Sequence, residues 1–107
     1  MPRPSLGPTR DLGKLAADLE RALLAPKDRS EMKRLLADLC TPAEIRTLAE
    51  RWHVARLLEQ GGMTYREIHD ATGVSTTTIV RVARFLRQER NEGYRLALDK
   101  LETADAE

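Results

Sequence analysis

The stretch TYREIHDATGVSTTTIVRVARFLRQ, residues 64–88, decides the fold of this chain. Thr64 followed by Glu67 is a capping box that starts a helix, and Gly73 can end that helix because glycine accepts a positive φ at little cost. Ser75 can cap the helix that follows. A short helix, a sharp turn and a second helix predict a helix-turn-helix over residues 64–88.

The apolar residues of this stretch are spaced so that both helices can pack on one core. We expect Ile68 to face inward from the first helix and Val74 to fill the space between the helices. Ile79 and Val82 then pack the second helix against the domain. This packing leaves the opposite face of the second helix exposed. Its residues are Thr76, Thr77, Val80, Arg81 and Arg84.

That exposed face has the chemistry of a DNA-binding surface. Residues 71–88 contain no Asp or Glu, although the formal net charge of the whole chain is only +1. Helix N-termini attract phosphate, threonine contacts base edges, and arginine binds guanine or phosphate. We therefore predict that the second helix lies in the major groove of double-stranded DNA. The predicted DNA-binding residues are Arg66, His69 (when protonated), Ser75, Thr76, Thr77, Thr78, Arg81 and Arg84.

Further helices are predicted on both sides of this stretch. Leucines and alanines from Leu12 to Leu23 recur every three or four residues, as in an amphipathic helix. Other helix boundaries are indicated by Pro26, Asp28, Thr41-Pro42, Gly61-Gly62 and Asn91. Six helices with short connections predict an all-α domain over residues 11–102. We interpret residues 1–10 as a flexible arm and residues 103–107 as an acidic tail.

The composition favours a soluble globular protein. Hydrophobic residues make up 41% of the chain and charged residues 33%. Cys40 is the only cysteine, so no internal disulfide can form, and residues 1–10 lack the apolar core of a signal peptide. No apolar run approaches the length of a membrane span. We expect a cytoplasmic protein that is associated with the nucleoid when bound to DNA.

No pattern in the sequence predicts catalysis or a metal site. His53 and His69 are far apart in the sequence and lack the cysteine or carboxylate spacing of a zinc site. No nucleophile–base arrangement and no phosphate-binding glycine loop is present. We therefore predict no enzymatic activity, no metal and no cofactor.

Several short motifs resemble those of the Trp repressor superfamily. They are Thr41-Pro42, Arg51, Gly62-Met63, Arg66-Glu67, Gly73 and Thr78-Ile79-x-Arg81. The segments 64–68 and 73–75, with the later Gly93-Tyr94, are more similar to its YerC/YecD-like branch. The resemblance covers residues 39–101 and implies an intertwined, all-helical homodimer that binds an operator through two helix-turn-helix units. It also implies that Arg66, His69, Thr76, Thr77 and Thr78 contact DNA.

The same resemblance raises the question of an effector. Arg51 and Arg81 match the two arginines that hold the tryptophan carboxylate in Trp repressor, and paired guanidinium groups suit a carboxylate. However, Val82 and Phe85 stand where Trp repressor has a glycine and a serine, so their bulk argues against tryptophan as corepressor. In the simpler interpretation, Arg51 makes a local ion pair and Arg81 contacts phosphate.

Taken together, the sequence predicts a homodimeric transcription repressor that binds an inverted-repeat operator. One alternative is a protein-interaction module whose Arg81–Arg84 face docks an acidic partner. Another is a DNA-binding regulator that is gated by a small carboxylate at Arg51 and Arg81. The two threonines Thr76 and Thr77 favour DNA, because an acidic partner needs charge more than short hydroxyls.

Overall fold

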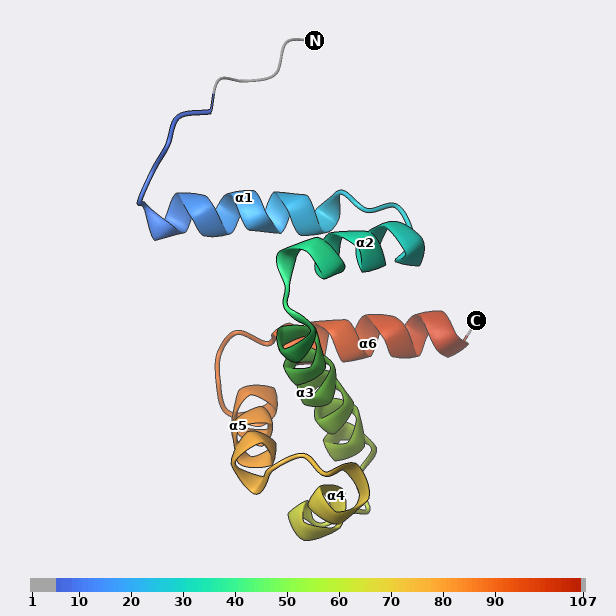
Figure 1. Cartoon of the computed structure of the whole chain (residues 1–107). Coiled ribbons are helices and arrows are strands. Elements are labelled where there is room, and N and C mark those ends of the chain that lie inside the picture. The colour runs from blue at the N-terminus through green and yellow to red at the C-terminus, as the bar shows by residue number, and fades with distance from the viewer. Residues whose placement is uncertain (1–5, 107) are drawn as a thin grey trace. The chain divides into compact units, whose positions relative to one another are not determined.

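The computed structural model describes residues 6–106, which form six α-helices and no strand (Figure 1). The prediction of an all-α fold is confirmed. The helices are α1 (Leu12–Leu24), α2 (Arg29–Leu39), α3 (Pro42–Gln60), α4 (Tyr65–Thr72), α5 (Thr76–Arg87) and α6 (Gly93–Ala106). The chain divides into two compact units, residues 1–42 (unit 1) and residues 43–107 (unit 2).

Unit 1 contains the helices α1 and α2, each started by an aspartate. Asp11 accepts a hydrogen bond from the Lys14 amide at 3.3 Å, and Asp28 accepts one from the Glu31 amide at 2.9 Å. The Glu31 carboxylate in turn accepts from the Lys27 amide at 2.9 Å. Neither helix contains a buried residue. The apolar stripes of both helices are therefore without a core of their own.

Unit 2 contains the core. The buried residues of its main cluster are Val54, Ala55 and Leu58 of α3, Ile68 of α4, Val74 in the turn, and Ile79, Val82 and Ala83 of α5. Fully burying a side chain such as valine or isoleucine contributes about 1.5–3 kcal/mol. This cluster therefore fixes α4 and α5 against α3.

The last helix begins after an unusual backbone position. Glu92 has φ 55°, a left-handed conformation that non-glycine residues seldom adopt. It directly precedes α6, whereas the sequence predicted Asn91 as the cap. Leu98 of α6 is buried, and Arg95 pairs with Glu59 of α3 and with Asp99, the latter at 3.0 Å.

The secondary structure near the two ends of the chain can be compared with the predicted arm and acidic tail. Residues 6–10 have no regular secondary structure, and the rest of the predicted arm, residues 1–5, lies outside the described residues. Residues 103–106, which we had interpreted as part of an acidic tail, continue α6. Glu107 lies outside the described residues.

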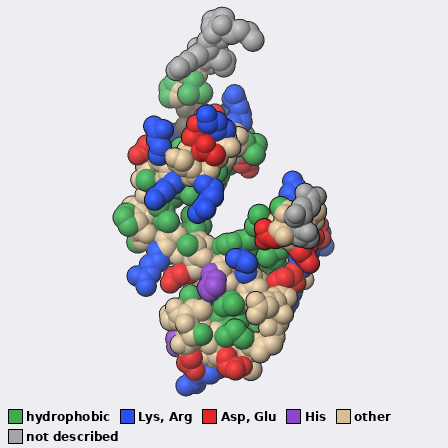
Figure 2. All heavy atoms as spheres, turned by 90° about the vertical axis from the view of Figure 1, so that its right-hand side faces the viewer, with side chains coloured by type: hydrophobic (Ala, Val, Ile, Leu, Met, Phe, Trp, Pro, Cys, Tyr) green, Lys and Arg blue, Asp and Glu red, His purple; other side chains and the backbone are tan. Residues whose placement is uncertain are grey.

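The surface mixes apolar and charged side chains. Figure 2 shows hydrophobic side chains exposed among acidic and basic ones. Within the described residues, no helix combines the length and the apolar character that crossing a membrane requires.

Candidate nucleic-acid interface

Helices α4 and α5 form a helix-turn-helix whose boundaries are set by local hydrogen bonds. Thr64 and Glu67 make a complete capping box at the start of α4. Gly73 ends that helix with φ 75°, and the Ser75 side chain accepts from the Thr78 amide at the start of α5. All three local predictions are confirmed.

Buried side chains hold the two helices at a fixed angle. Ile68, Ile79 and Val82 are fully buried, and Val74 in the turn is nearly so. The Thr72 hydroxyl donates to the Ile68 carbonyl at 2.7 Å and accepts from the Val74 amide at 3.1 Å. Because the turn is fixed from both sides, the orientation of α5 is set by unit 2 alone.

Four of the exposed residues of α5 form a surface that we call the recognition face. They are Thr76, Thr77, Val80 and Arg84. Residues three and four positions apart lie on one side of a helix, so these four form a continuous surface. Its first two turns are uncharged, and residues 71–88 contain no carboxylate.

Two other predicted contact residues, Ser75 and Thr78, form the N-terminal cap of α5. The Ser75 hydroxyl donates to the Thr78 hydroxyl oxygen at 3.0 Å and accepts from the Thr78 amide at 3.2 Å. Thr78 is half-buried, whereas Thr76 and Thr77 are exposed. The structure therefore separates the predicted threonines into two on the recognition face and one in the cap.

Arg81 and Arg84 meet at the ring of Phe85. The Arg81 guanidinium carbon lies 4.4 Å from the ring centre, and that of Arg84 lies 5.3 Å from it. Both distances are within the range of a cation–π interaction. The Arg84 Nε also donates to the Glu89 carboxylate at 2.7 Å. Arg84 nevertheless stays exposed, whereas Arg81 is half-buried.

Arg66 and His69 lie on α4, next to the turn. Arg66 is exposed and lies 3.5 Å from the Asp70 carboxylate, a weak surface ion pair. His69 is half-buried, with its Nδ1 2.8 Å from the Val74 carbonyl oxygen. Since a carbonyl can only accept, Nδ1 carries a hydrogen, and Nε2 of the neutral ring has none to donate. Only the protonated ring can therefore donate from Nε2 to a phosphate.

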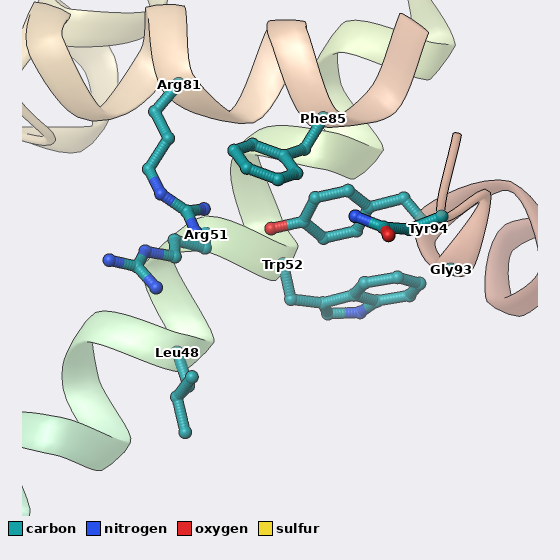
Figure 3. Close-up of a pocket in the computed structure, with 8 residues that line it drawn as sticks. Leu48, Arg51, Trp52, Arg81, Phe85, Gly93 and Tyr94 are labelled. Carbon is teal, nitrogen blue, oxygen red and sulfur yellow. The ribbon is translucent and has the colours of Figure 1, made fainter. Parts of the chain in front are cut away.

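A pocket of about 450 Å³ opens beside α5 (Figure 3). Its lining residues are Leu48, Arg51, Trp52, Arg81, Phe85, Asn91, Gly93 and Tyr94. The Trp52 and Tyr94 rings are stacked, with centres 6.3 Å apart. Figure 3 shows the Arg81 side chain extending from α5 toward Arg51. No lining residue is a carboxylate, so the two guanidinium groups have no acidic counterpart there.

The pocket partly changes the expectations from the sequence. Phe85 lines it, as expected of a side chain that restricts this space, but Val82 belongs to the core and does not line the pocket. The Arg51 Nε is buried without a hydrogen-bond partner, where the simpler interpretation had placed a local ion pair. A buried donor without a partner is costly, which makes Arg51 a position where a ligand oxygen would be stabilised.

The contact of Phe85 with both arginines was not predicted from the sequence. The spacing of Arg81 and Phe85, four residues apart on one helix, was a signal from which their contact could have been predicted.

Within the described residues, no group of three or more His, Cys, Asp or Glu side chains is arranged to hold a metal.

Comparison with known proteins gives consistent matches over most of the chain. The family model of the Trp repressor protein matches residues 16–102. YerC of Bacillus subtilis (strain 168), an uncharacterised protein, is 43% identical over 95 residues, which cover 89% of either chain.

Two solved structures are similar in fold as well as in sequence. A TrpR-like protein from Eubacterium eligens has a TM-score of 0.77 and 37% identity, over 83% of this chain and 90% of that one. A chain from Staphylococcus aureus, described as a candidate Trp repressor, has a TM-score of 0.75 and 36% identity, over 88% and 96% respectively.

Proposed function

The chain belongs to the Trp repressor family, and we propose that it represses transcription by binding operator DNA as a dimer. The observation that carries this proposal is the recognition face of α5. Thr76, Thr77 and Arg84 are exposed there on a helix fixed by its own core, with no carboxylate between residues 71 and 88. Such a helix fits the major groove, and bound protein would block access to a promoter by steric occlusion.

The dimer is supported by the exposed apolar residues of unit 1. Leu12, Leu15 and Leu19 repeat along one side of α1, yet none of them is buried. A second copy of the chain would bury these leucines and present two recognition helices. Two-fold symmetry places such helices about 34 Å apart, so the expected operator is an inverted repeat.

Each predicted DNA-binding residue has a role in this proposal. Thr76, Thr77 and Arg66 contact bases or the groove edge, while Arg81, Arg84 and protonated His69 contact phosphate. Ser75 and Thr78 present the start of α5, where unpaired amides favour a phosphate oxygen. The affinity is then supplied mainly by phosphate contacts and must fall steeply with salt.

The test is to select bound duplexes from a random library and to titrate the best one at several salt concentrations. We expect an inverted repeat and an affinity that decreases linearly with salt on a logarithmic scale. No bound DNA, or an affinity that does not depend on salt, would rule the proposal out. Recovery of an acidic protein partner in place of DNA would instead support the interaction-module alternative.

Arg66→Ala and Arg46→Ala form a matched pair for this titration. Both arginines are exposed (side chains 83% and 80%), and each lies 3.5 Å from a carboxylate four residues on, Asp70 or Glu50. Only Arg66 belongs to the helix-turn-helix. We expect Arg66→Ala to weaken DNA binding and Arg46→Ala to leave it nearly unchanged. Equal effects would remove Arg66 from the interface.

A second candidate function adds control by an effector. The observation that favours it is the pocket in which the Arg51 Nε lacks a partner and two guanidinium groups face no lining carboxylate. We propose a small carboxylate there, rather than tryptophan, because the Phe85 ring occupies one wall against Arg81. A thermal-shift screen of amino acids and small organic acids, including tryptophan, tests it, since a ligand of the folded state raises the melting temperature.

A further inference from the structure

The recognition face contains one exposed apolar residue, Val80, that does not contribute to the core. Val80 is 55% exposed, belongs to neither the core cluster nor the pocket lining, and lies mid-helix in α5. Ile79 and Val82, one residue before and two residues after Val80, are fully buried, so other side chains already anchor α5 to the core. A β-branched residue at an exposed helical position also lowers helix propensity slightly.

Single exposed apolar residues are common on protein surfaces, so exposure alone does not indicate a function for Val80. Its position among the other residues of the recognition face does. Thr76 and Thr77 lie one turn before Val80, and Arg84 lies one turn after it. All three of these uncharged side chains carry γ-methyl groups, one on each threonine and two on the valine. The first half of the recognition face is therefore uncharged and contains methyl groups.

We propose that Val80 is a specificity-determining residue that recognises the 5-methyl group of a thymine in the major groove. Thymine is the base that presents a methyl group there, and cytosine, the other pyrimidine, has a hydrogen in its place. Valine has no donor or acceptor in its side chain, so an apolar group is the partner that it can favour. Arginine contacts with phosphate carry no such information about the base.

The charge distribution along α5 fits this role. Arginines begin at Arg81 and continue with Arg84 and Arg87, while the turn before them is neutral. In helix-turn-helix proteins the first residues of the recognition helix contact base edges. Val80 lies one turn after Thr76 and Thr77. In this proposal it therefore adjoins the base-contacting residues, while the arginines contact the phosphate backbone. This inference deepens the proposed function and rests on it.

The experiment uses the full chain and the duplex selected from the random library. Each thymine of one half-site is replaced in turn by deoxyuridine, which keeps the base pair and removes only the methyl group, and the Kd is measured. We expect the wild-type affinity to fall roughly three- to fivefold at one thymine, the loss for one methyl group leaving an apolar contact. At the remaining thymines of the half-site we expect little change.

The same series is then repeated with Val80→Ala, which favours the helix and keeps the fold. The thymine-to-uracil ratio at the sensitive position should fall to about one, since the contact is already lost. Leu96→Ala is the matched control: Leu96 is similarly exposed (58%) but lies on α6, so that variant must keep the wild-type ratio whatever its overall affinity.

The outcomes separate this inference from the function on which it rests. A selected operator without thymine under the recognition face, a wild-type protein insensitive at every thymine, or an unchanged ratio in Val80→Ala each overturns the role of Val80 while DNA binding stands. Failure to recover any bound duplex overturns the proposed function and this inference with it.

Discussion

Both units of the chain contain amphipathic helices, but only those of unit 2 bury their apolar residues in a core. In unit 2, amphipathic helices close around Ile68, Ile79 and Val82, which are completely buried. In unit 1, α1 and α2 have apolar stripes of the same spacing, but no residue of either helix is buried. Asp11 and Asp28 cap the helices of unit 1, and Thr64 and Ser75 cap α4 and α5 of unit 2. The difference therefore lies in packing and not in local helix formation.

This difference suggests a division of labour. Unit 2 fixes α5 with a core of its own, whereas the helices of unit 1 bury none of their leucines. In the proposed dimer, assembly therefore depends mainly on unit 1 and DNA recognition on unit 2. Variants in each unit should separate these two properties.

The largest effect is expected from a charge in the stripe of α1. Leu19 is 44% exposed, and Leu19→Asp would place a carboxylate in the proposed subunit interface. We expect a monomer whose DNA affinity is lower by on the order of 100-fold, because the second recognition helix no longer binds in an intramolecular step. Sedimentation equilibrium and DNA titration measure the two effects.

The control for this variant is Asp18→Ala, the preceding position on the same helix, where the side chain is 63% exposed. It should leave both the dimer and the DNA affinity intact. A dimeric Leu19→Asp protein with wild-type affinity would show that unit 1 does not form the interface.

The second effect concerns the core of unit 2. Ile79→Ala removes a fully buried side chain and should lower the free energy of unfolding by about 2–5 kcal/mol. Val80→Ala, one residue further on and exposed, should change it little. Urea denaturation followed by circular dichroism gives both values. Similar values for the two variants would contradict the orientation assigned to α5.

These two units also show what could be predicted from the sequence. The six helices, the capping box of Thr64 with Glu67, the turn at Gly73 and the family all followed from short motifs. Such features depend on residues close together in the chain, so local rules suffice for them. The buried positions Ile68, Ile79 and Val82 followed from helical spacing, and Val74 from its place between the two helices.

Features that depend on side-chain rotamers or on residues far apart in the chain were harder to predict from the sequence. The four-residue spacing of Arg81 and Phe85 allows their contact but does not determine the rotamers that place the guanidinium over the ring. No local motif indicates that the Arg51 Nε lacks a partner. The ion pair of Arg95 with Glu59 joins residues on different helices. The positive φ of Glu92, directly before α6, was not indicated by any motif. The division into two units likewise depends on packing, which a helical pattern alone does not specify.

A smaller effect is expected at the turn that joins α4 and α5. A Cβ added to Gly73 would meet no atom within 4 Å, so Gly73→Ala tests the backbone alone at φ 75°. The left-handed conformation costs an alanine about 1–2 kcal/mol, and the free energy of unfolding should fall by that amount. Gly93→Ala is the control, since Gly93 also has open space but no positive φ, and alanine there should be neutral or stabilising. Equal losses would mean that the positive φ is not the reason for glycine at this turn.

The smallest effect is expected at the start of α4 and appears only in acid. The Thr64 backbone amide donates to the Glu67 carboxylate at 2.9 Å, and this bond, with a lesser contribution from the Thr64 side chain, lowers the pKa of Glu67 below its ordinary value of 4.5. A depressed pKa in the folded state means that the unfolded chain binds the proton more readily, so the stabilisation is present above pH 4.5 and is lost as the pH falls through the lower folded value. Glu67→Gln keeps an oxygen acceptor but cannot titrate, and its free energy of unfolding should approach that of the wild type as the solution is acidified. If the difference between the two proteins stays constant from neutral to acidic pH, the capping box does not depend on the charge of Glu67.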